Sequence, residues 1–143
     1  MSHRLIRDAI AARKPLVATA KTTVADAARL MKKHDVGALM IVDAGRLTGI
    51  FTERDALFRV IADARDPGTT PVGDVMTSRP QTIAPDKAVG HALLMMYEGG
   101  FRHVPVVARG KPVGMVSARD ALGPELEEFQ AELLQREHLR EVI

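Results

Sequence analysis

Along the first part of the chain, the spacing of apolar residues predicts a short strand followed by a helix. An extended stretch is expected at 16–18, directly after a proline. From Val24 onward, apolar residues recur every three or four positions, which is the spacing of a helix with one buried face. Thr22 or Thr23 is the expected N-cap of this helix, and Gly37 is its expected end.

A hairpin and a second helix are predicted next. The uninterrupted apolar run 38–42 is typical of a buried strand. The polar turn 43–46 leads into a returning strand at 47–51. Thr52 then begins a helix that reaches about residue 64. These elements form one unit with the order strand, helix, strand, strand, helix.

The second part of the chain repeats this order. Before it, Thr70 is expected to cap a short helix at 72–76, with Pro71 at the first helical position. Gly123 and Pro124 are expected to break the closing helix. The other predicted elements are a helix at 86–98, strands at 104–107 and 112–116, a helix from Ser117, and a C-terminal helix at 125–142.

The C-terminal helix is predicted to be amphipathic. We expect its apolar face to pack on the chain's own sheet or on a second copy of the chain, and a dedicated partner site is the alternative. The face consists of Leu126, Phe129, Leu133 and Leu134.

The two units are a gapless repeat at an offset of 65 positions, from Pro15 to Asp120. One pattern recurs within it: glycine, two apolar residues, a hydroxyl residue, two further residues and aspartate. It covers 49–55 in the first copy and 114–120 in the second. A fixed offset of this kind marks a duplicated structural unit.

A single unit of about 50 residues buries both faces of a small sheet poorly, whereas two packed units bury them well. We therefore predict an α/β (α+β) fold in which two units pack with approximate two-fold symmetry. The expected divisions are 8–65 for the first unit, 66–122 for the second and 123–143 for a C-terminal helix.

The repeated polar residues have a structural interpretation that needs no ligand. Thr52 with Asp55, and Ser117 with Asp120, occupy the positions of a capping box at the start of a helix. The glycines of the motif then serve strand curvature or close packing.

The same arrangement also suits a nucleotide. A helix N-terminus presents free N–H groups and a positive dipole to a phosphate. The cap hydroxyl can donate to a phosphate oxygen, and the carboxylate one turn later can accept from two ribose hydroxyls. Arg54 and Arg119, which lie beside the two aspartates, could also reach a phosphate.

Together these features resemble a tandem pair of CBS domains, the units named after cystathionine beta-synthase. The resemblance covers about residues 8–122. It rests on the repeated motif, on VMTSRP at 75–80 and on GFRHVPVV at 100–107, in this order and spacing. It implies a disc-shaped, pseudo-symmetric pair whose clefts bind adenosine-containing ligands.

The resemblance also implies roles for individual residues. Asp55 and Asp120 would hold the ribose. The implied ligand is AMP, ADP or ATP, with NAD or S-adenosylmethionine as further candidates. The implied phosphate contacts are Thr52, Ser117, Arg54, Arg119, Arg102 and His103; the adenine pocket is Val17, Val36, Ala38, Ile50, Gln81, Phe101 and Met115; the motif glycines are Gly49 and Gly114.

The two copies differ where the middle strand of each unit begins. The second copy has Arg102 and His103 there, and the first has Gly37 and Ala38. A solvated strand edge is the alternative role of the two basic residues. We expect two sites of unequal affinity, and the more charged ligand is expected in the cleft lined by Arg102, His103, Ser117 and Asp120.

Composition narrows the classes of function. Twenty Lys and Arg against 18 Asp and Glu, with one Tyr and no Trp, argue against a nucleic-acid-binding surface. No signal peptide or membrane span is indicated, and the lack of cysteine fits a reducing compartment, so we expect a cytoplasmic protein. The five histidines lack the spacing of metal ligands, so no metal site is expected.

We therefore predict a non-enzymatic nucleotide sensor whose signal is a change in the relative orientation of the two units. Since only about 20 residues follow the second unit, regulation in trans of an unidentified effector is expected. The resemblance further implies a homodimer. The main alternative is an interaction module with empty clefts, and an enzyme is the third hypothesis, for which the sequence offers no nucleophile or general base.

Overall fold

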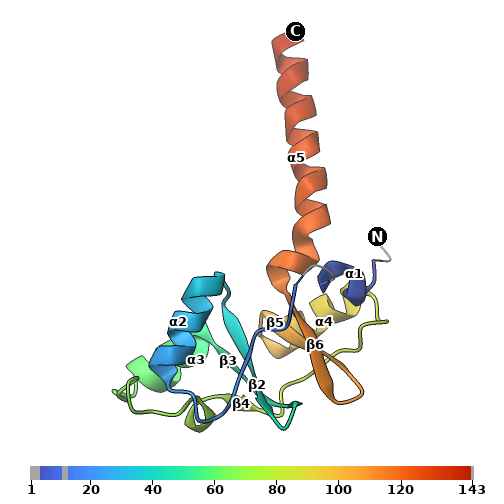
Figure 1. Cartoon of the computed structure of the whole chain (residues 1–143). Coiled ribbons are helices and arrows are strands. Elements are labelled where there is room, and N and C mark those ends of the chain that lie inside the picture. The colour runs from blue at the N-terminus through green and yellow to red at the C-terminus, as the bar shows by residue number, and fades with distance from the viewer. Residues whose placement is uncertain (1–3, 11–12, 143) are drawn as a thin grey trace.

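Two small sheets organise the structure, one in each repeat (Figure 1). The computed structural model describes residues 4–10 and 13–142. The strands are β1 (Val17–Ala18), β2 (Ala38–Asp43), β3 (Arg46–Thr52), β4 (Thr77–Ser78), β5 (His103–Ala108) and β6 (Lys111–Ser117). The helices are α1 (Ile6–Ile10), α2 (Val24–His34), α3 (Glu53–Asp55), η1 (Ala56–Ile61), η2 (Val72–Asp74), α4 (Val89–Gly99) and α5 (Ala118–Val142).

The predicted hairpins are confirmed in both repeats. β2 and β3 pair antiparallel, and so do β5 and β6. Both turns use two residues with positive φ: Ala44 (50°) and Gly45 (79°) in the first, Arg109 (55°) and Gly110 (79°) in the second. Two left-handed residues in succession match the twist of the flanking strands, which explains why such a short turn closes each hairpin.

The opening strands of the two units differ more than the repeat predicts. β1 pairs in parallel with β2 in the first unit. In the second unit, the corresponding strand is reduced to a bridge between Ile83 and Val106. Prolines at 80 and 85 flank this segment and cannot donate to a ladder, which limits its pairing. The first sheet instead gains β4, a strand that the apolar pattern did not predict.

Several predicted helix boundaries are wrong. α2 has Thr23 as its N-cap, but it ends at His34, with Asp35 as its C-cap in the left-handed conformation (φ 52°), rather than at Gly37. α4 begins at Val89 instead of residue 86, because residues 85–87 form a turn and Ala88 is extended. Ala88 is held there by the N-terminal segment, because Leu5 pairs with it as a β-bridge.

The first closing helix and the linker helix also differ from the prediction. After one α-helical turn, α3 continues as the π-helix η1, in which the N–H of Ala62 donates to the carbonyl of Leu57, five residues earlier. The linker helix is a single 3₁₀ turn, η2, with Pro71 rather than Thr70 as its N-cap.

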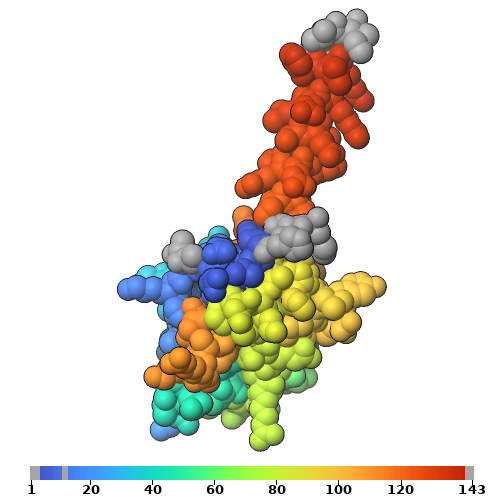
Figure 2. Space-filling view, turned by 90° about the vertical axis from the view of Figure 1, so that its right-hand side faces the viewer, coloured from blue at the N-terminus to red at the C-terminus, as the bar shows by residue number. Residues whose placement is uncertain are grey.

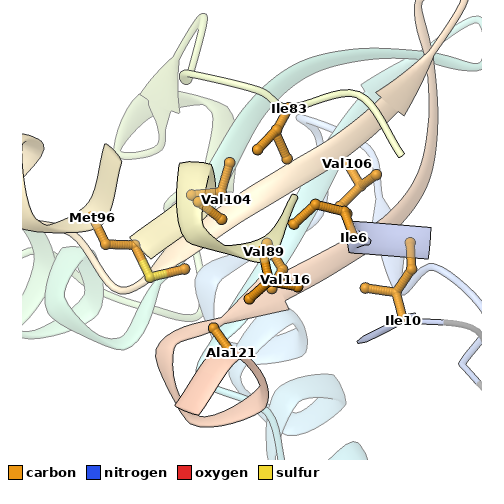
Figure 3. Close-up of a cluster of buried hydrophobic side chains, with 10 residues drawn as sticks. Ile6, Ile10, Ile83, Val89, Met96, Val104, Val106, Val116 and Ala121 are labelled. Atoms are coloured by element: carbon orange, nitrogen blue, oxygen red, sulfur yellow. The ribbon is translucent and has the colours of Figure 1, made fainter. Parts of the chain in front are cut away.

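The helical segment that precedes each repeat packs on the other repeat. α1 places Ile6 in the core of the second repeat, and η2 places Val72 in the core of the first. Both side chains are 0% exposed. Backbone bonds follow the same exchange, from Ile6 N–H to the carbonyl of Lys87 (2.8 Å) and from Val72 N–H to that of Thr22 (2.7 Å). Figure 3 shows the second core, which includes Ile6, Ile10, Ile83, Val89, Met96, Val104, Val106, Val116 and Ala121.

α5 is one continuous helix, so the predicted break at Gly123 and Pro124 is wrong. A proline inside a helix removes the N–H that would bond to the carbonyl four residues earlier, here that of Asp120. The guanidinium of Arg4 donates to this carbonyl at 2.8 Å and replaces the missing bond. A residue distant in the sequence therefore satisfies the backbone that the proline leaves open.

Beyond Pro124, α5 projects away from the body of the molecule (Figures 1 and 2). Its apolar face is exposed, so packing on the chain's own sheet is ruled out as its role, while a second copy or another partner remains open. The exposed residues include the four predicted ones, Leu126, Phe129, Leu133 and Leu134.

Candidate functional site: a cleft between the repeats

A cleft of about 1120 Å³ lies between the motif of the first repeat and the middle strand of the second. Thr52 and Asp55, at the end of β3 and in α3, form one wall. Phe101, Arg102 and His103, at the start of β5, form the opposite wall. The segment 77–81 completes the lining. The lining of this cleft therefore comes from both repeats.

The cleft contains eight of the residues singled out in the sequence. They are Ile50, Thr52, Arg54, Asp55, Gln81, Phe101, Arg102 and His103. Seven others do not line it: Val17, Val36, Ala38, Met115, Ser117, Arg119 and Asp120. All of these seven except Val17 stand 65 positions from a residue that does, so they mark the pseudo-symmetric counterpart of the cleft.

The predicted grouping of the two basic residues needs correction. Arg102 and His103 line the cleft of Thr52 and Asp55, not one shared with Ser117 and Asp120. The reason is the packing of the repeats, which brings the start of one unit's middle strand to the motif of the other. The first copy's motif therefore has the basic wall.

Thr52 and Asp55 form the capping box that the sequence suggested. The hydroxyl oxygen of Thr52 accepts from the N–H of Asp55 (3.1 Å), and a carboxylate oxygen of Asp55 accepts from the N–H of Thr52 (3.0 Å). These bonds fix both side chains at the cleft wall. Asp55 is only 7% exposed. The structural and the ligand-binding interpretations of the motif are therefore compatible in this copy.

The second carboxylate oxygen of Asp55 is less tightly held. The Nε of Arg59 lies 3.6 Å from it, an ion-pair distance that exceeds a good hydrogen bond. Arg59 also donates to the carbonyls of Val75 (3.3 Å) and Met76 (2.9 Å), so its guanidinium is shared with the backbone. Oδ1 of Asp55 therefore keeps acceptor capacity for a ligand hydroxyl.

The charge of the cleft favours an anion. Its lining holds four arginines and two carboxylates, in addition to His103. The guanidinium of Arg54 lies 5.0 Å from the ring centroid of Phe58, a cation–π contact that orients it. The arginines are Arg54, Arg59, Arg79 and Arg102, and the carboxylates belong to Glu53 and Asp55.

His103 lies within electrostatic range of both motifs. Burial lowers its pKa below the ordinary histidine value and Arg102 lowers it further, whereas the carboxylates of Glu53 and Asp120 oppose the shift. The net direction is downward, so the imidazole is neutral at pH 7 in the unliganded protein. A negatively charged ligand beside it would favour its protonation.

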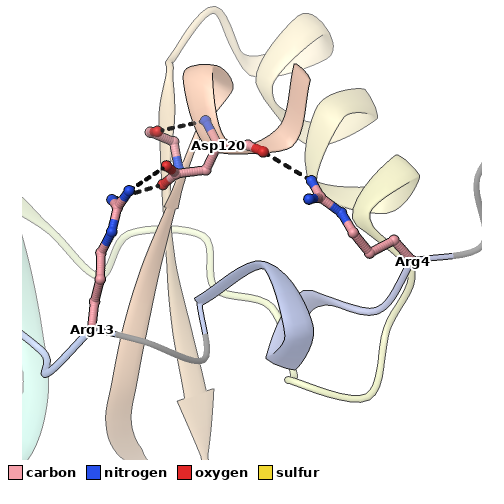
Figure 4. Close-up of polar contacts among 4 residues, drawn as sticks. Arg4, Arg13 and Asp120 are labelled. Carbon is pink, nitrogen blue, oxygen red and sulfur yellow. Dashed lines mark hydrogen bonds and ion pairs between the residues drawn. The ribbon is translucent and has the colours of Figure 1, made fainter. Parts of the chain in front are cut away.

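The second copy of the motif makes the same capping box with a different surrounding. Asp120 N–H donates to the Ser117 hydroxyl at 3.1 Å, and Ser117 N–H donates to the Asp120 carboxylate at 3.3 Å. This carboxylate also forms an ion pair with Arg13 at 3.0 Å (Figure 4). Pro124 stands where the repeat offset places the equivalent of Arg59.

The motif glycines serve close packing. A Cβ at Gly49 would lie 3.0 Å from the carbonyl oxygen of Thr77 and would also meet Met76. A Cβ at Gly114 would lie 2.6 Å from Cδ1 of Ile10. The segment that precedes each repeat and packs on the other one is called its crossing segment; it is 4–14 before the first repeat and 69–79 before the second. In each repeat the glycine lets the crossing segment that packs there approach the last strand, and neither glycine lines the cleft.

The sequence analysis missed several residues of the cleft wall. Arg59 and Phe58 were signalled only by their four-residue spacing from Asp55 and Arg54, which places each pair on one helix face. Arg79 belongs to the segment 75–80 on which the resemblance rests, but no role was predicted for it, since its place depends on the pairing of β4. Among the described residues, no group of acidic residues or histidines is arranged to hold a metal ion.

Two repeats of one α/β unit, with a shared anion-attracting cleft, define a paired ligand-binding module. The chain belongs to the CBS domain family, whose model matches residues 6–62 and 72–124. Proteins of this family are typically regulatory rather than catalytic, and pairs of these domains are known to bind adenosine-containing ligands.

Individual relatives agree with this assignment. The chain is 38% identical, over 120 residues, to the Arabidopsis thaliana "CBS domain-containing protein CBSX3, mitochondrial", covering 80% of this chain and 58% of that protein. It resembles a CBS domain protein from Pyrobaculum aerophilum complexed with AMP (TM-score 0.74, 27% identity, 81% of this chain and 88% of that one). It also resembles the CBS domain pair of protein MJ0100, solved with 5-methylthioadenosine and S-adenosylmethionine (TM-score 0.79, 26% identity, 89% and 99%).

Proposed function

We propose that this chain is a regulatory module that binds an adenine nucleotide in the cleft between its two repeats. The observation that carries the proposal is the convergence of Thr52 and Asp55 from the first repeat with Phe101 and Arg102 from the second. A carboxylate, a helix start, guanidinium groups and an aromatic ring are the groups that a ribose, a phosphate and a base require.

Each part of the nucleotide has a candidate partner. Oδ1 of Asp55 would accept from the ribose hydroxyls, because it is the less occupied oxygen of this carboxylate. Arg102 and His103 would contact the phosphate together with Thr52. Ile50 and Phe101 supply apolar surface for the base, and Gln81 supplies an amide for its polar edge.

The charge of the cleft favours a phosphorylated ligand. Four arginines suit AMP, ADP or ATP better than the cationic S-adenosylmethionine. NAD also carries the required adenosine and phosphates. The AMP-bound and S-adenosylmethionine-bound neighbours support the adenosine class and leave the order of preference among these ligands to experiment.

Ligand binding would act on the relative orientation of the repeats. Because the two cleft walls come from different repeats, a ligand that binds one orientation more tightly shifts the population toward it. We propose a cytoplasmic protein that forms a homodimer and regulates a separate effector. None of the described helices is both long and apolar enough to cross a membrane.

Calorimetric titration with AMP, ADP and ATP tests the proposal. We expect binding to the purified chain, and thermal stabilisation of about 2.7 kcal/mol at a ligand concentration of 100 times the dissociation constant. Asp55→Asn should weaken binding at least about tenfold (about 1.4 kcal/mol). Asp63→Asn, at an exposed position outside the cleft, is the matched control and should bind like the wild type.

The competing hypothesis is an interaction module whose cleft has no physiological ligand. It requires that none of the adenine nucleotides, NAD or S-adenosylmethionine releases heat or stabilises the chain. That result would overturn the proposal.

A further inference from the structure

The carboxylate of Asp120 is already occupied by a guanidinium of the same chain. We propose that Arg13 closes the second motif to nucleotide, so that the resting molecule has one open site, at Asp55, and one closed site, at Asp120. The inference rests on the proposed function, and it adds a residue that determines how many sites are available.

The contact is bidentate (Figure 4). Nη2 of Arg13 lies 3.0 Å from Oδ1 of Asp120, and Nη1 donates to Oδ2 at 3.3 Å. Oδ2 also accepts from the N–H of Ser117. A carboxylate offers about four lone-pair positions. Three of them are thus in use, and a ribose diol needs two.

The equivalent carboxylate of the first repeat, that of Asp55, has fewer donors close to it. Oδ2 of Asp55 accepts from the N–H of Thr52, and Oδ1 has only Arg59 at 3.6 Å. Arg59 is anchored by the carbonyls of Val75 and Met76 and contacts a single carboxylate oxygen. The two repeats therefore differ in acceptor capacity although their motifs are the same.

The position of Arg13 places it at the wall of the second site. Arg13 stands 65 residues before Ser78. The neighbours of Ser78, Thr77 and Arg79, line the first cleft. By the symmetry of the repeats, Arg13 lies at the corresponding wall of the counterpart. Its side chain is 65% exposed, so it can leave Asp120 without opening the core.

Ligand and Arg13 then compete for the same oxygens. A nucleotide can occupy the second motif only when Arg13 has moved away. Its apparent affinity is therefore its intrinsic affinity multiplied by the fraction of molecules in which Arg13 has left Asp120. Removal of the guanidinium should therefore strengthen binding at this site, although it removes a positive charge near an anionic ligand. A blocking arginine and a phosphate-binding arginine therefore predict opposite changes in affinity when the guanidinium is removed.

The test is a titration with AMP of the wild type and of Arg13→Gln. We expect about one AMP per chain for the wild type and about two for Arg13→Gln, since the second site tightens at least about tenfold. Arg7→Gln is the matched control: it removes the same charge from the exposed side of α1 and should leave the stoichiometry at one.

A second pair of variants isolates the closed site. Asp55→Asn should weaken the tight binding event at least about tenfold, and Asp55→Asn with Arg13→Gln should gain one tight binding event that depends on Asp120. If the wild type already binds two AMP molecules of similar affinity, or if Arg13→Gln binds AMP more weakly than the wild type, the inference is overturned while the proposed function survives. If neither the wild type nor Arg13→Gln binds AMP, ADP or ATP, the proposed function itself fails.

Discussion

In the first repeat, the arginine that pairs with the motif aspartate comes from the repeat's own helix, whereas in the second it comes from the crossing segment. Arg59 lies one turn after Asp55 and bonds outward to the crossing segment. In the second repeat Pro124 takes this place, and Arg4 and Arg13 bond inward to Asp120. In both repeats arginine side chains join the motif to the crossing segment. In the first repeat the arginine belongs to the motif's helix, and in the second the arginines belong to the crossing segment. A duplicated motif therefore does not guarantee a duplicated site.

The largest difference between the repeats is expected at the motif glycines. Gly49→Ala brings a methyl group to 3.0 Å from the backbone oxygen of Thr77, whereas the atoms nearest to the methyl group of Gly114→Ala belong to the side chain of Ile10. Overpacking costs about 1–3 kcal/mol, and we expect the upper end at Gly49 and the lower end at Gly114. Denaturant unfolding measures both.

Gly123→Ala provides the control for the glycine variants. No atom lies within 4 Å of the added Cβ, and the position is inside α5, so we expect stabilisation of about 0.5–1 kcal/mol. Equal losses at Gly49 and Gly114 would show that the two crossing segments yield equally to the added methyl group.

The helix starts of the two repeats offer a second contrast. Thr23 caps α2 by accepting from the N–H of Asp26 (3.2 Å), whereas Ala88 at the equivalent position of α4 has no capping side chain. Thr23→Ala should therefore lower the free energy of unfolding by about 1 kcal/mol, and Ala88→Thr should raise it by up to about 1 kcal/mol. Thermal unfolding of the two single variants decides the point; a loss on Ala88→Thr would contradict it.

A smaller effect is expected at the N-terminal end of α5, where Arg4 bonds to the carbonyl of Asp120. In Pro124→Ala the restored N–H can bond to the carbonyl of Asp120, which Arg4 otherwise satisfies. Arg4→Ala should then cost about 0.5 kcal/mol less in the Pro124→Ala background than in the wild type. A double-mutant cycle of unfolding free energies measures this coupling, and strict additivity would mean that Arg4 does not replace the missing helical bond.

The last test concerns pH. Burial lowers the pKa of His103, and a phosphate bound beside it would raise this pKa, so binding would take up a proton. Affinity for AMP should therefore rise about threefold more for the wild type than for His103→Asn between about pH 7.5 and pH 5.5, less than the tenfold of a full pKa unit. Using the difference between the two proteins removes the titration of the phosphate itself. Parallel profiles would exclude His103 as a phosphate contact.

The features that the sequence predicted correctly are those set by local patterns. The hairpins followed from apolar runs and turn residues, and the caps at Thr23, Thr52 and Ser117 followed from short polar motifs. The family followed from the order of these motifs along the chain.

The features it missed depend on contacts between distant residues. The continuity of α5 through Pro124 requires Arg4, and the state of Asp120 requires Arg13, more than a hundred positions earlier. The grouping of Arg102 with Thr52 depends on how the repeats pack. No local spacing encodes these pairings, because each depends on surfaces that meet only after both repeats have formed.

The exchange of crossing segments carries a consequence for the origin of this architecture. A chain with one repeat would leave the position of Ile6 or Val72 unfilled unless a second chain supplied its own preceding segment. Joining two repeats in one polypeptide converts that exchange between molecules into one within a molecule, at the high effective concentration that a short connection provides. The stability of the pair then no longer depends on protein concentration, and the two segments are free to diverge. The two segments do differ at these positions: Arg4 and Arg13 of the first correspond, at the offset of 65, to Thr69 and Ser78 of the second.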